Sequence, residues 1–409
     1  MIKGTIELKG DKSISHRVLI LASLSKGKSI IKNLSNGKDV ERTINILKNC
    51  GIVIKRTKKG ACVEGKQLFS TKKRFYCGNS GSTARFMLGY LPSQGISGIL
   101  YGDRSLSKRP MNRVIEPLKK MNIKLNSNTS TLPISFQAST PTAYHHELTI
   151  PSAQVKTALI LTSLACNQKC SIKDKFNTRD HTERLIKYLG YKSNHYSKFI
   201  PKGFNYKVAG DISNAAFIIS AALLIPRSDI IIKGVLYNKT RIGYIKVLKK
   251  MGANITISNT EERYNEIICN IHVKHTPCLE GVTLSTDDVT AMIDEIPIFS
   301  LVASYAKGVT KVSNAQELRY KESDRIKAII YNLKKGNINI IEKDDGFIIK
   351  GPNILYNTSF KHFQDHRIAM TFEVAKFILT KKLDINPKTD SLVGTSFPEF
   401  YKILRALNV

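Results

Sequence analysis

The feature that most constrains the fold is a segment type that recurs along the chain. It consists of an amphipathic helix, a small residue or Asn, a short strand, a polar turn and a second strand. Copies occupy 41–65 and 112–136, and others begin at 182, 244 and 323. In each copy, apolar residues fall at i, i+3, i+4 and i+7 before they begin to alternate as in a strand. The residues expected to end the helices in a left-handed conformation are Gly51, Asn122, Gly190, Gly252 and Gly336.

This repeat predicts a two-domain protein of the mixed α/β (α+β) class. The helix ends lie roughly 70 residues apart, so the chain holds about six units. A length of 409 residues exceeds what one ordinary core organises. The antiparallel hairpin expected after each helix argues against a doubly wound parallel sheet, in which helices and strands alternate strictly. Six units divide naturally into two domains of three.

The charge balance favours anionic partners. Lys and Arg number 64 against 32 Asp and Glu, a formal net charge of +32. Nucleic acid, acidic membranes and small phosphates or carboxylates would all suit such a protein. The excess is spread along the whole chain, so most of it is explained as a solvated, lysine-rich surface. A hydrophobic fraction of 42% and a charged fraction of 23% are typical of a folded globular protein.

Several functional classes are disfavoured by missing sequence features. Seven scattered cysteines without a C-x-x-C pair argue against a disulfide framework or a zinc ribbon, and fit a reducing cytoplasm. The first residues form no apolar signal region, and the longest apolar run, 215–226, is too short to span a bilayer. Neither a G-x-G-x-x-G sequence after a strand nor a Walker A sequence occurs, so no dinucleotide or ATP site is predicted.

Cations stand close behind the small or polar residues that open several predicted helices. The pairs are Ser13 with His16 and Arg17, Gly81 and Ser82 with Arg85, Ser152 with Gln154 and Lys156, Ser323 with Arg325, and Asp365 with His366 and Arg367. A helix N-terminus already carries partial positive charge, so a cation there is unfavourable unless an anion is shared. Chance alone would place a basic residue in about half of such turns in this lysine-rich chain. The recurrence therefore predicts a polyanion site built from several helix starts.

Two further segments carry acidic side chains. Residues 291–303 place Asp294 and Glu295 inside an apolar run, where unpaired charge is costly. A surface turn with Pro297 as helix breaker is the structural alternative. Residues 319–329 gather Lys321, Glu322 and Arg325 around a helix start, which could equally be a solvated charged turn.

Together these segments resemble the 5-enolpyruvylshikimate-3-phosphate synthases, also called 3-phosphoshikimate 1-carboxyvinyltransferases. Ten short motifs occur in the order of that family and span nearly the whole chain. They are GDKSISHR (10–17), CGNSGSTAR (77–85), GDRSLSKRPM (102–111), PSAQVK (151–156), TRDHTE (178–183), GDISNAAF (210–217), MIDEIP (292–297), ELRYKESDRI (317–326), DHRIAM (365–370) and TSFPEF (395–400). Each motif alone is weakly specific, but the ordered set is not.

The resemblance implies a two-domain inside-out α/β barrel, with three βαβαββ units in each domain and helix N-termini facing the cleft. Domain I would comprise 1–10 and 211–409, and domain II 11–210. A two-strand hinge is expected near 9–12 and 208–212. The resemblance also implies a cytoplasmic enzyme, expected to be a monomer, that works on small-molecule substrates without a metal or organic cofactor and binds neither nucleic acid nor membrane.

The resemblance further implies a site for each substrate. The residues expected to bind 3-phosphoshikimate are Lys12, Ser13, Arg17, Ser152, Ala153, Gln154, Arg179, Asp294 and Lys321. Those expected to bind phosphoenolpyruvate are Lys12, Asn79, Gly81, Arg109, Gln154, Arg325 and Arg367. Asp294 is the expected general base for the 5-hydroxyl group, and Glu322 and Lys12 are candidates for proton transfer at the methylene carbon.

The chain departs from one branch of the family at three positions. Phe86 replaces a Pro, Thr395 replaces a Lys near a phosphate, and Glu317 replaces an Asn beside the shikimate ring. The remaining motifs match the other bacterial branch, so these positions are interpreted as branch markers. Whether Thr395 costs a phosphate contact stays open.

Two alternative functions were weighed. The enolpyruvyl transferase that acts on UDP-N-acetylglucosamine shares the fold, but it has Asn after the N-terminal Lys and uses a loop Cys. Here Ser13 follows Lys12, and 102–111 contains no Cys. A nucleic-acid-binding module is suggested only by the charge and lacks the corresponding motifs.

Overall fold

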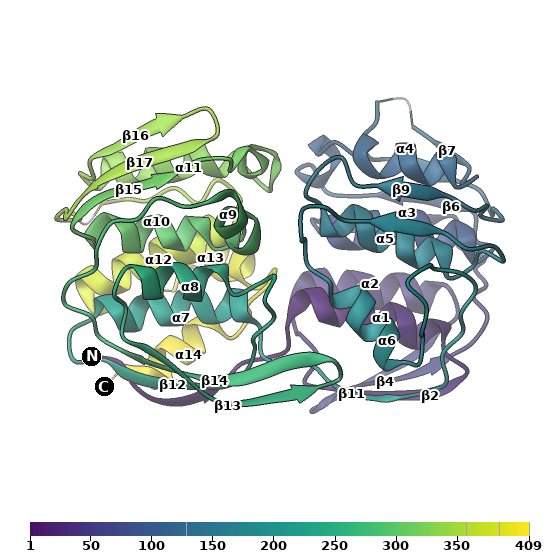
Figure 1. Cartoon of the computed structure of the whole chain (residues 1–409), viewed down its shortest axis with the longest axis horizontal. Helices are drawn as coiled ribbons and strands as arrows, with labels where there is room; N and C mark the ends of the chain where they lie inside the picture. Colours follow the sequence, from purple (N-terminus) through teal and green to yellow (C-terminus); the bar gives the residue numbers. More distant parts are fainter. Residues whose placement is uncertain (128, 357, 384, 409) are drawn as a thin grey trace. The chain divides into compact units, whose positions relative to one another are not determined.

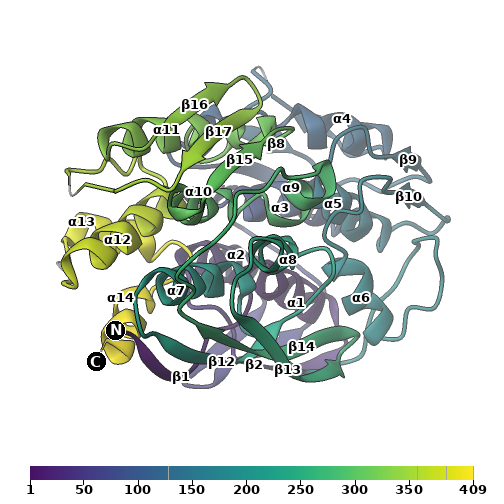
Figure 2. The ribbon, with the colours of Figure 1, turned by 60° about the vertical axis from the view of Figure 1, so that its left-hand side comes forward.

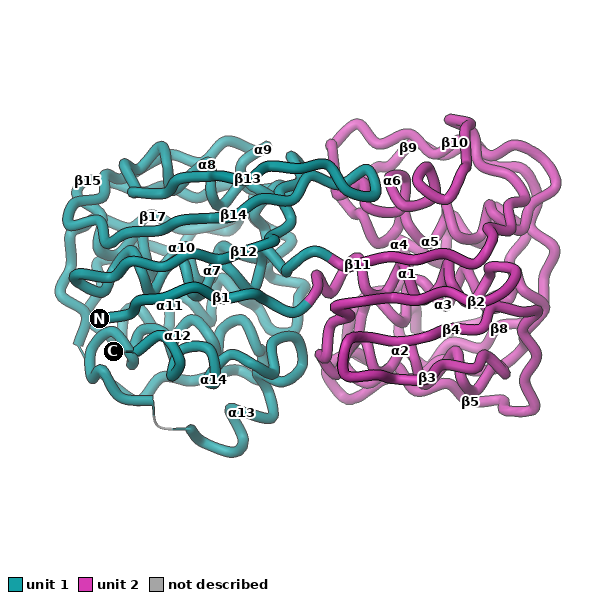
Figure 3. The backbone as a smooth tube through the Cα atoms, turned by 90° about the horizontal axis from the view of Figure 1, so that it is seen from below, with its two compact units in different colours: residues 1–9, 209–409 teal, residues 10–208 magenta. Residues whose placement is uncertain are grey.

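A computed structural model describes residues 1–127, 129–356, 358–383 and 385–408. The chain forms two compact units (Figure 3): unit 1 comprises residues 1–9 and 209–409, and unit 2 comprises residues 10–208. The boundaries expected from the sequence differ from this division by one residue at the first crossing and two at the second. None of the described helices is long and apolar enough to cross a membrane.

Unit 2 is built around three buried helices, α1 (Lys12–Leu24), α3 (Gly81–Ser93) and α5 (Ala153–Ser163) (Figure 1). The outer helices are α2 (Lys38–Asn49), α4 (Asn112–Lys120) and α6 (His181–Tyr188). Val40, Ile44 and Leu47 show why α2 lies outside: they recur at i, i+4 and i+7 and are fully buried, so the helix has one apolar face.

The sheets of unit 2 lie outside its buried helices. One sheet has the order β11-β2-β4-β3, with β11 (Asn205–Lys207), β2 (Gly27–Lys32), β4 (Gly60–Gly65) and β3 (Val53–Thr57). A second has the order β5-β6-β8-β7, with β5 (Arg74–Tyr76), β6 (Gly98–Tyr101), β8 (Ile134–Phe136) and β7 (Leu125–Asn126). The short strands β9 (His145–Glu147) and β10 (Ser171–Lys173) pair in parallel.

Unit 1 repeats this plan around α7 (Ile212–Leu224), α10 (Ile296–Tyr305) and α12 (His366–Thr380), which contact one another. Its other helices are α8 (Gly243–Lys250), α9 (Thr286–Met292), α11 (Arg325–Lys335), α13 (Pro387–Val393) and α14 (Phe400–Leu407). One sheet, in the order β1-β12-β14-β13, joins β1 (Lys3–Glu7), β12 (Asp229–Leu236), β14 (Glu266–Lys274) and β13 (Ile255–Arg263). The other, in the order β15-β17-β16, joins β15 (Gly308–Val312), β17 (Gly346–Gly351) and β16 (Ile340–Lys343).

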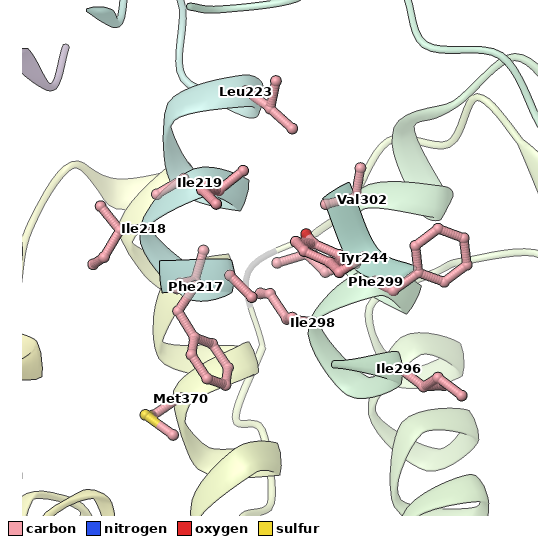
Figure 4. Packing of buried hydrophobic residues seen from close by; sticks show 14 of the residues in the cluster. Phe217, Ile218, Ile219, Leu223, Tyr244, Ile296, Ile298, Phe299, Val302 and Met370 are labelled. Carbon is pink, nitrogen blue, oxygen red and sulfur yellow. The ribbon is translucent and has the colours of Figure 1, made fainter. Parts of the chain in front are cut away.

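The core of unit 1 is a continuous apolar cluster between its buried helices. Phe217 on α7, Ile298 and Phe299 on α10 and Tyr244 on α8 are all fully buried there (Figure 4). Replacing a buried Phe by Ala typically costs about 3–5 kcal/mol, so this packing holds the buried helices of unit 1 together. The first strand and the last described residues lie side by side (Figure 2), where Ile2 bridges Asn408.

Each crossing between units joins a strand in one unit to a buried helix in the other. Strand β1 pairs in parallel with β12 of unit 1, yet the chain continues into α1 of unit 2. Strand β11 pairs in parallel with β2 of unit 2, yet the chain continues into α7 of unit 1. Each unit is therefore completed by a strand from a distant part of the sequence.

Two details of the predicted repeat are wrong. Gly51, Gly190, Gly252 and Asn122 have positive φ as predicted, but Gly336 has φ −82° and the left-handed residue is Asn337. A Cβ at Gly336 would lie 2.5 Å from Leu355 Cδ1, so a larger residue there would have to displace that side chain. The third copy, which begins at 182, lacks the expected hairpin, because residues 189–204 form only isolated bridges. At the end of unit 1, the described residues of 352–408 likewise form helices α12, α13 and α14 and no named strand.

Candidate active site

The predicted site residues of unit 2 gather at the starts of its buried helices. Asp11 caps α1 by accepting from Ile14 N at 2.9 Å, and Ser152 caps α5 by accepting from Val155 N at 3.4 Å. Ser80 caps α3. The sequence correctly indicated Ser152 but placed the other two caps one to two residues late, because Ser13, Gly81 and Ser82 are equally plausible cap residues by type.

A polar network connects the starts of α3 and α5. Arg85 Nη1 donates to Gln154 Oε1 at 2.7 Å, and Gln154 Nε2 donates to Ser82 Oγ at 2.9 Å. Arg85 is 7% exposed. Gln154, a predicted ligand of both substrates, is therefore held by two residues of the neighbouring helix.

Gly81 lies directly beneath two guanidinium groups. A Cβ at this position would lie 2.7 Å from Arg85 Nη1 and 3.4 Å from Arg109 Nη1. Arg109 donates to Asn79 Oδ1, while Asn79 Nδ2 donates to Asp103 Oδ2 at 2.8 Å. Backbone N–H groups at a helix start and two guanidiniums together suit an anion such as a phosphate or carboxylate.

Arg17 is bound on several sides within unit 2. Its Nε and Nη2 donate to Thr182 Oγ1 at 2.8 Å and Thr157 Oγ1 at 2.7 Å, and Nη1 donates to the Ser13 carbonyl at 2.7 Å. Its guanidinium carbon lies 4.9 Å from the Phe86 ring centroid. These bonds join α1, α5 and α6, so Arg17 has a structural role whatever it binds.

Lys12 is the first residue of α1, and its Nζ lies 2.9 Å from Asp39 Oδ2. The next turn of α1 carries His16, whose Nδ1 lies 2.8 Å from Thr43 Oγ1. Burial lowers the pKa of His16 well below its usual value, and the charges of Lys12 and Arg17 lower it further. His16 is therefore neutral in the folded protein near pH 7.

A buried cation orders the loop that carries Arg179. Lys156 Nζ lies 2.8 Å from Asp174 Oδ2 and 2.7 Å from Glu183 Oε1. Asp174 also accepts from Thr178 N at 2.9 Å and Thr178 Oγ1 at 2.6 Å. Burial alone would raise the pKa of Asp174, but the hydrogen bonds from Lys156 and Thr178 lower it overall. Sequence inspection missed Asp174 because an isolated Asp in a loop has no distinguishing pattern.

In unit 1, Arg325 sits at the centre of three carboxylates. Its Nε lies 2.8 Å from Asp365 Oδ2, its Nη2 lies 2.6 Å from Glu322 Oε2, and its Nη1 lies 3.4 Å from Asp294 Oδ1. The Arg325 and Asp365 side chains are 1% and 0% exposed. Burial alone would lower the pKa of Arg325, but Asp365, Glu322 and Asp294 raise it above its usual value. The helix start of α11 is capped by Asp324, not by the predicted Ser323.

The two acids of 291–303 occupy the break between α9 and α10. The Asp294 side chain is 18% exposed, whereas the Glu295 side chain is 1% exposed. Arg367, near the start of α12, faces both: Nη2 lies 4.0 Å from Asp294 Oδ2, and Nη1 lies 3.9 Å from Glu295 Oε1. Pro297 does not break the helix, because it lies in the first turn of α10 where its missing N–H is tolerated.

Lys321 follows the short helix η2 (Gln316–Tyr320), which contains Glu317. Burial lowers the pKa of Lys321, and Asp294 and Glu317 oppose that shift. Among the residues that the structure describes, none forms a hydrogen bond or ion pair with the Lys321 amino group. The residues of unit 1 that the sequence singled out thus lie near one another, at the starts of α11 and α12 and at the break between α9 and α10; they are Asp294, Lys321, Glu322, Arg325 and Arg367.

The comparison with known proteins decides the family. The sequence model described as EPSP synthase (3-phosphoshikimate 1-carboxyvinyltransferase) matches residues 1–404. The chain belongs to the EPSP synthase family. It is 39% identical to the 3-phosphoshikimate 1-carboxyvinyltransferase of Endomicrobium trichonymphae, with 98% of this chain and 96% of that protein covered. It is 38% identical to the protein of the same name from Persephonella marina, with 99% and 97% covered.

Solved structures agree with this assignment to the EPSP synthase family. An EPSP synthase structure from Acinetobacter baumannii has a TM-score of 0.85 at 32% identity and covers 100% of this chain and 96% of that one. The two-domain inside-out α/β fold predicted from the sequence is confirmed. The enolpyruvyl transferase NikO from Streptomyces tendae has a TM-score of 0.74 at 13% identity, covers 99% and 95%, and shares the fold.

Two features bear on what else an EPSP synthase of this sequence could bind. Among the described residues, no group of three His, Cys, Asp or Glu side chains is arranged to hold a metal ion. A cavity in unit 2 is lined by residues at the far ends of the buried helices, such as Ser25, Gln94 and Ala165, and by none of the predicted site residues. The predicted residues Lys12, Gly81 and Ala153 begin α1, α3 and α5 and so lie at the opposite ends of these helices.

Proposed function

We propose that this chain transfers the enolpyruvyl group of phosphoenolpyruvate to the 5-hydroxyl of 3-phosphoshikimate and releases phosphate. The product is 5-enolpyruvylshikimate 3-phosphate, an intermediate of aromatic amino acid biosynthesis. The observation that carries the proposal is the family match over residues 1–404, within which all ten ordered motifs lie. A transferase of this kind needs no redox group, since no carbon changes its oxidation state overall.

The proposed chemistry requires an acid and a base acting on one ternary complex. Protonation of C3 of phosphoenolpyruvate makes C2 electrophilic, and the 5-oxygen then forms a bond to C2 as its proton leaves. The tetrahedral ketal next breaks its C2–phosphate bond while C3 loses a proton, which restores the enol ether. We assign Asp294 as the base for the 5-hydroxyl, and Glu322 and Lys12 as candidates for the C3 proton.

The anionic charges of both substrates must be offset before the reacting atoms approach. We assign Arg325 and Arg367 of unit 1 to phosphoenolpyruvate, along with Lys12, Asn79, Gly81, Arg109 and Gln154 of unit 2. For 3-phosphoshikimate we assign Lys12, Ser13, Arg17, Ser152, Ala153, Gln154 and Arg179 of unit 2, and Asp294 and Lys321 of unit 1. The Arg367 guanidinium lies 3.9–4.0 Å from Asp294 and Glu295, which is beyond hydrogen-bond distance, so these carboxylates do not use its N–H donors, and this supports the assignment.

We further infer that the protein works as a monomer in a reducing compartment such as the cytoplasm. All seven cysteines are free, and five of them are buried, which suits a compartment that keeps thiols reduced. Size-exclusion chromatography with light scattering should give a mass near 45.8 kDa. A mass near twice that value would contradict the monomer.

The function is tested by phosphate release from purified protein with both substrates. Release should require phosphoenolpyruvate and 3-phosphoshikimate together and should continue in the presence of a chelator. UDP-N-acetylglucosamine in place of 3-phosphoshikimate should give no release. Release with that nucleotide sugar, or loss of activity on chelation, would refute the proposal.

A further inference from the structure

Arg85 has no assigned role in the proposed reaction, yet it is placed to control one of the proposed ligands. It lies in α3, is 7% exposed, and donates to Gln154 Oε1 at 2.7 Å. Its other terminal nitrogen, Nη2, donates to the Pro110 carbonyl at 3.4 Å. The guanidinium is thus held on both sides and points at the amide of Gln154.

Of the two described side chains that bind the Gln154 amide, only Arg85 determines its orientation. A guanidinium has only donors, so the amide atom that faces it must be oxygen. The other end of the amide meets the Ser82 hydroxyl at 2.9 Å. A hydroxyl can donate as well as accept, so Ser82 would bind the amide equally well after a 180° flip. Without Arg85, nothing in this network distinguishes the two orientations.

The fixed orientation determines what Gln154 offers to a ligand. Nε2 carries two hydrogens, and Ser82 takes one of them. Within the described part of the chain no group accepts the second N–H, which is therefore left as a donor for a ligand, whereas a flipped amide would present an oxygen. Both proposed substrates carry phosphate and carboxylate groups, which attract a donor and repel an acceptor.

We propose that Arg85 is a positioning residue that locks the Gln154 amide so that its second N–H is offered to the anionic substrates. The proposal rests on the proposed function, which supplies the anionic ligands. Gly81 supports the same arrangement, because a Cβ there would lie 2.7 Å from Arg85 Nη1. A side chain at position 81 would push the guanidinium away from Gln154.

The test is a double-mutant cycle on phosphate release, with Arg85→Met, Gln154→Met and both together. Each single variant should lower kcat/KM by about 10- to 150-fold, the range for a lost hydrogen bond to a charged group. The kcat/KM of the double variant should lie within about threefold of the less active single variant, since an amide without a fixed orientation contributes little to binding. Arg56→Met, which removes a half-exposed arginine 3.6 Å from Glu41, is the matched control and should match the wild type.

A second variant separates positioning from simple support of the fold. Gln154→Glu should keep or raise the melting temperature, because its carboxylate pairs with Arg85, but should lower kcat/KM at least 100-fold by removing the donor. If the single effects multiply in the double variant, or if Gln154→Glu retains activity, the proposal is wrong.

The outcome also separates this proposal from the proposed function. An inactive wild type would refute the function, whereas an active wild type with an additive cycle would refute only the role of Arg85. The same cycle is measured by calorimetric binding of phosphoenolpyruvate and 3-phosphoshikimate, which detects the Gln154 donor without turnover. Coupled losses of affinity there support the proposal, and independent losses overturn it.

Discussion

Replacing Arg325 by Met should destabilise unit 1 as well as affect substrate binding. From sequence alone, Arg325 is expected to hold phosphoenolpyruvate, so its loss should weaken that ligand only. The structure adds that Arg325 is the common partner of Asp365, Glu322 and Asp294. Without the guanidinium, the buried Asp365 carboxylate would lose its close ion pair, while Lys321 and Arg367 would remain to offset the charge of Asp294.

The size of the effect follows from burial and geometry. Arg325 and Asp365 are 1% and 0% exposed, so solvent screens their attraction very little. A hydrogen bond to a charged group contributes about 1.5–3 kcal/mol, and breaking one side of a buried ion pair costs about 3–5 kcal/mol. These terms are not additive, so we expect a loss of about 3–5 kcal/mol in the free energy of unfolding. Arg325→Lys should recover part of it, because a single ammonium cannot contact all three acids.

Urea unfolding followed by far-ultraviolet circular dichroism measures this loss, since the chain contains no tryptophan for fluorescence. Arg263→Met is the control, because Arg263 pairs with Glu261 on the surface of the same unit and its loss should cost no more than about 1 kcal/mol. Lowering the pH should narrow the gap between Arg325→Met and the wild type, as the uncompensated carboxylates take up protons. If Arg325→Met is no less stable than Arg263→Met, the carboxylate cluster does not depend on Arg325.

Four further outcomes are expected. Arg367→Met should weaken phosphoenolpyruvate by about 1.5–3 kcal/mol in calorimetry while 3-phosphoshikimate changes little. It should also lower stability, because the Glu295 carboxylate is 1% exposed and loses the guanidinium that lies 3.9 Å away. Asp294→Asn should bind both substrates within a few-fold of the wild type and turn over about two to four orders of magnitude more slowly; unfolding instead would make it a structural residue. Gly81→Ala should raise the KM for phosphoenolpyruvate with an unchanged melting temperature, because its methyl group displaces Arg85. The pKa of the buried His16 is lowered, so the unfolded state binds more protons than the folded state. Stability should therefore fall as the pH drops below about 6.5, by at most about 1.4 kcal/mol per pH unit. His16→Gln should reduce this pH dependence in thermal melts at pH 7.5 and pH 5.

Local sequence patterns determined the repeated helix-and-strand segments of this fold. Helix periodicity followed by strand alternation is set by which residues can be buried, so copies such as 41–65 and 112–136 were recognisable without any structure. Residue type also indicated the left-handed ends at Gly51 and Gly252, since few other residues adopt positive φ cheaply. The ordered motifs identified the candidate site residues, because residue type and order along the chain can be compared with a family without a structure.

Only the tertiary structure decided which charged and polar side chains contact one another. Arg325 and Asp365 are 40 residues apart in sequence, and Arg85 and Gln154 are 69 apart, so no local pattern links either pair. The same holds for β1 and β11, which pair with strands far along the chain because parallel pairing needs a crossover. Residue type showed that Arg325 and Arg367 could each bind an anion. Their surroundings show that Arg325 donates hydrogen bonds to three carboxylates, whereas Arg367 lies 3.9–4.0 Å from its nearest carboxylate oxygens, a difference that depends on packing between helices.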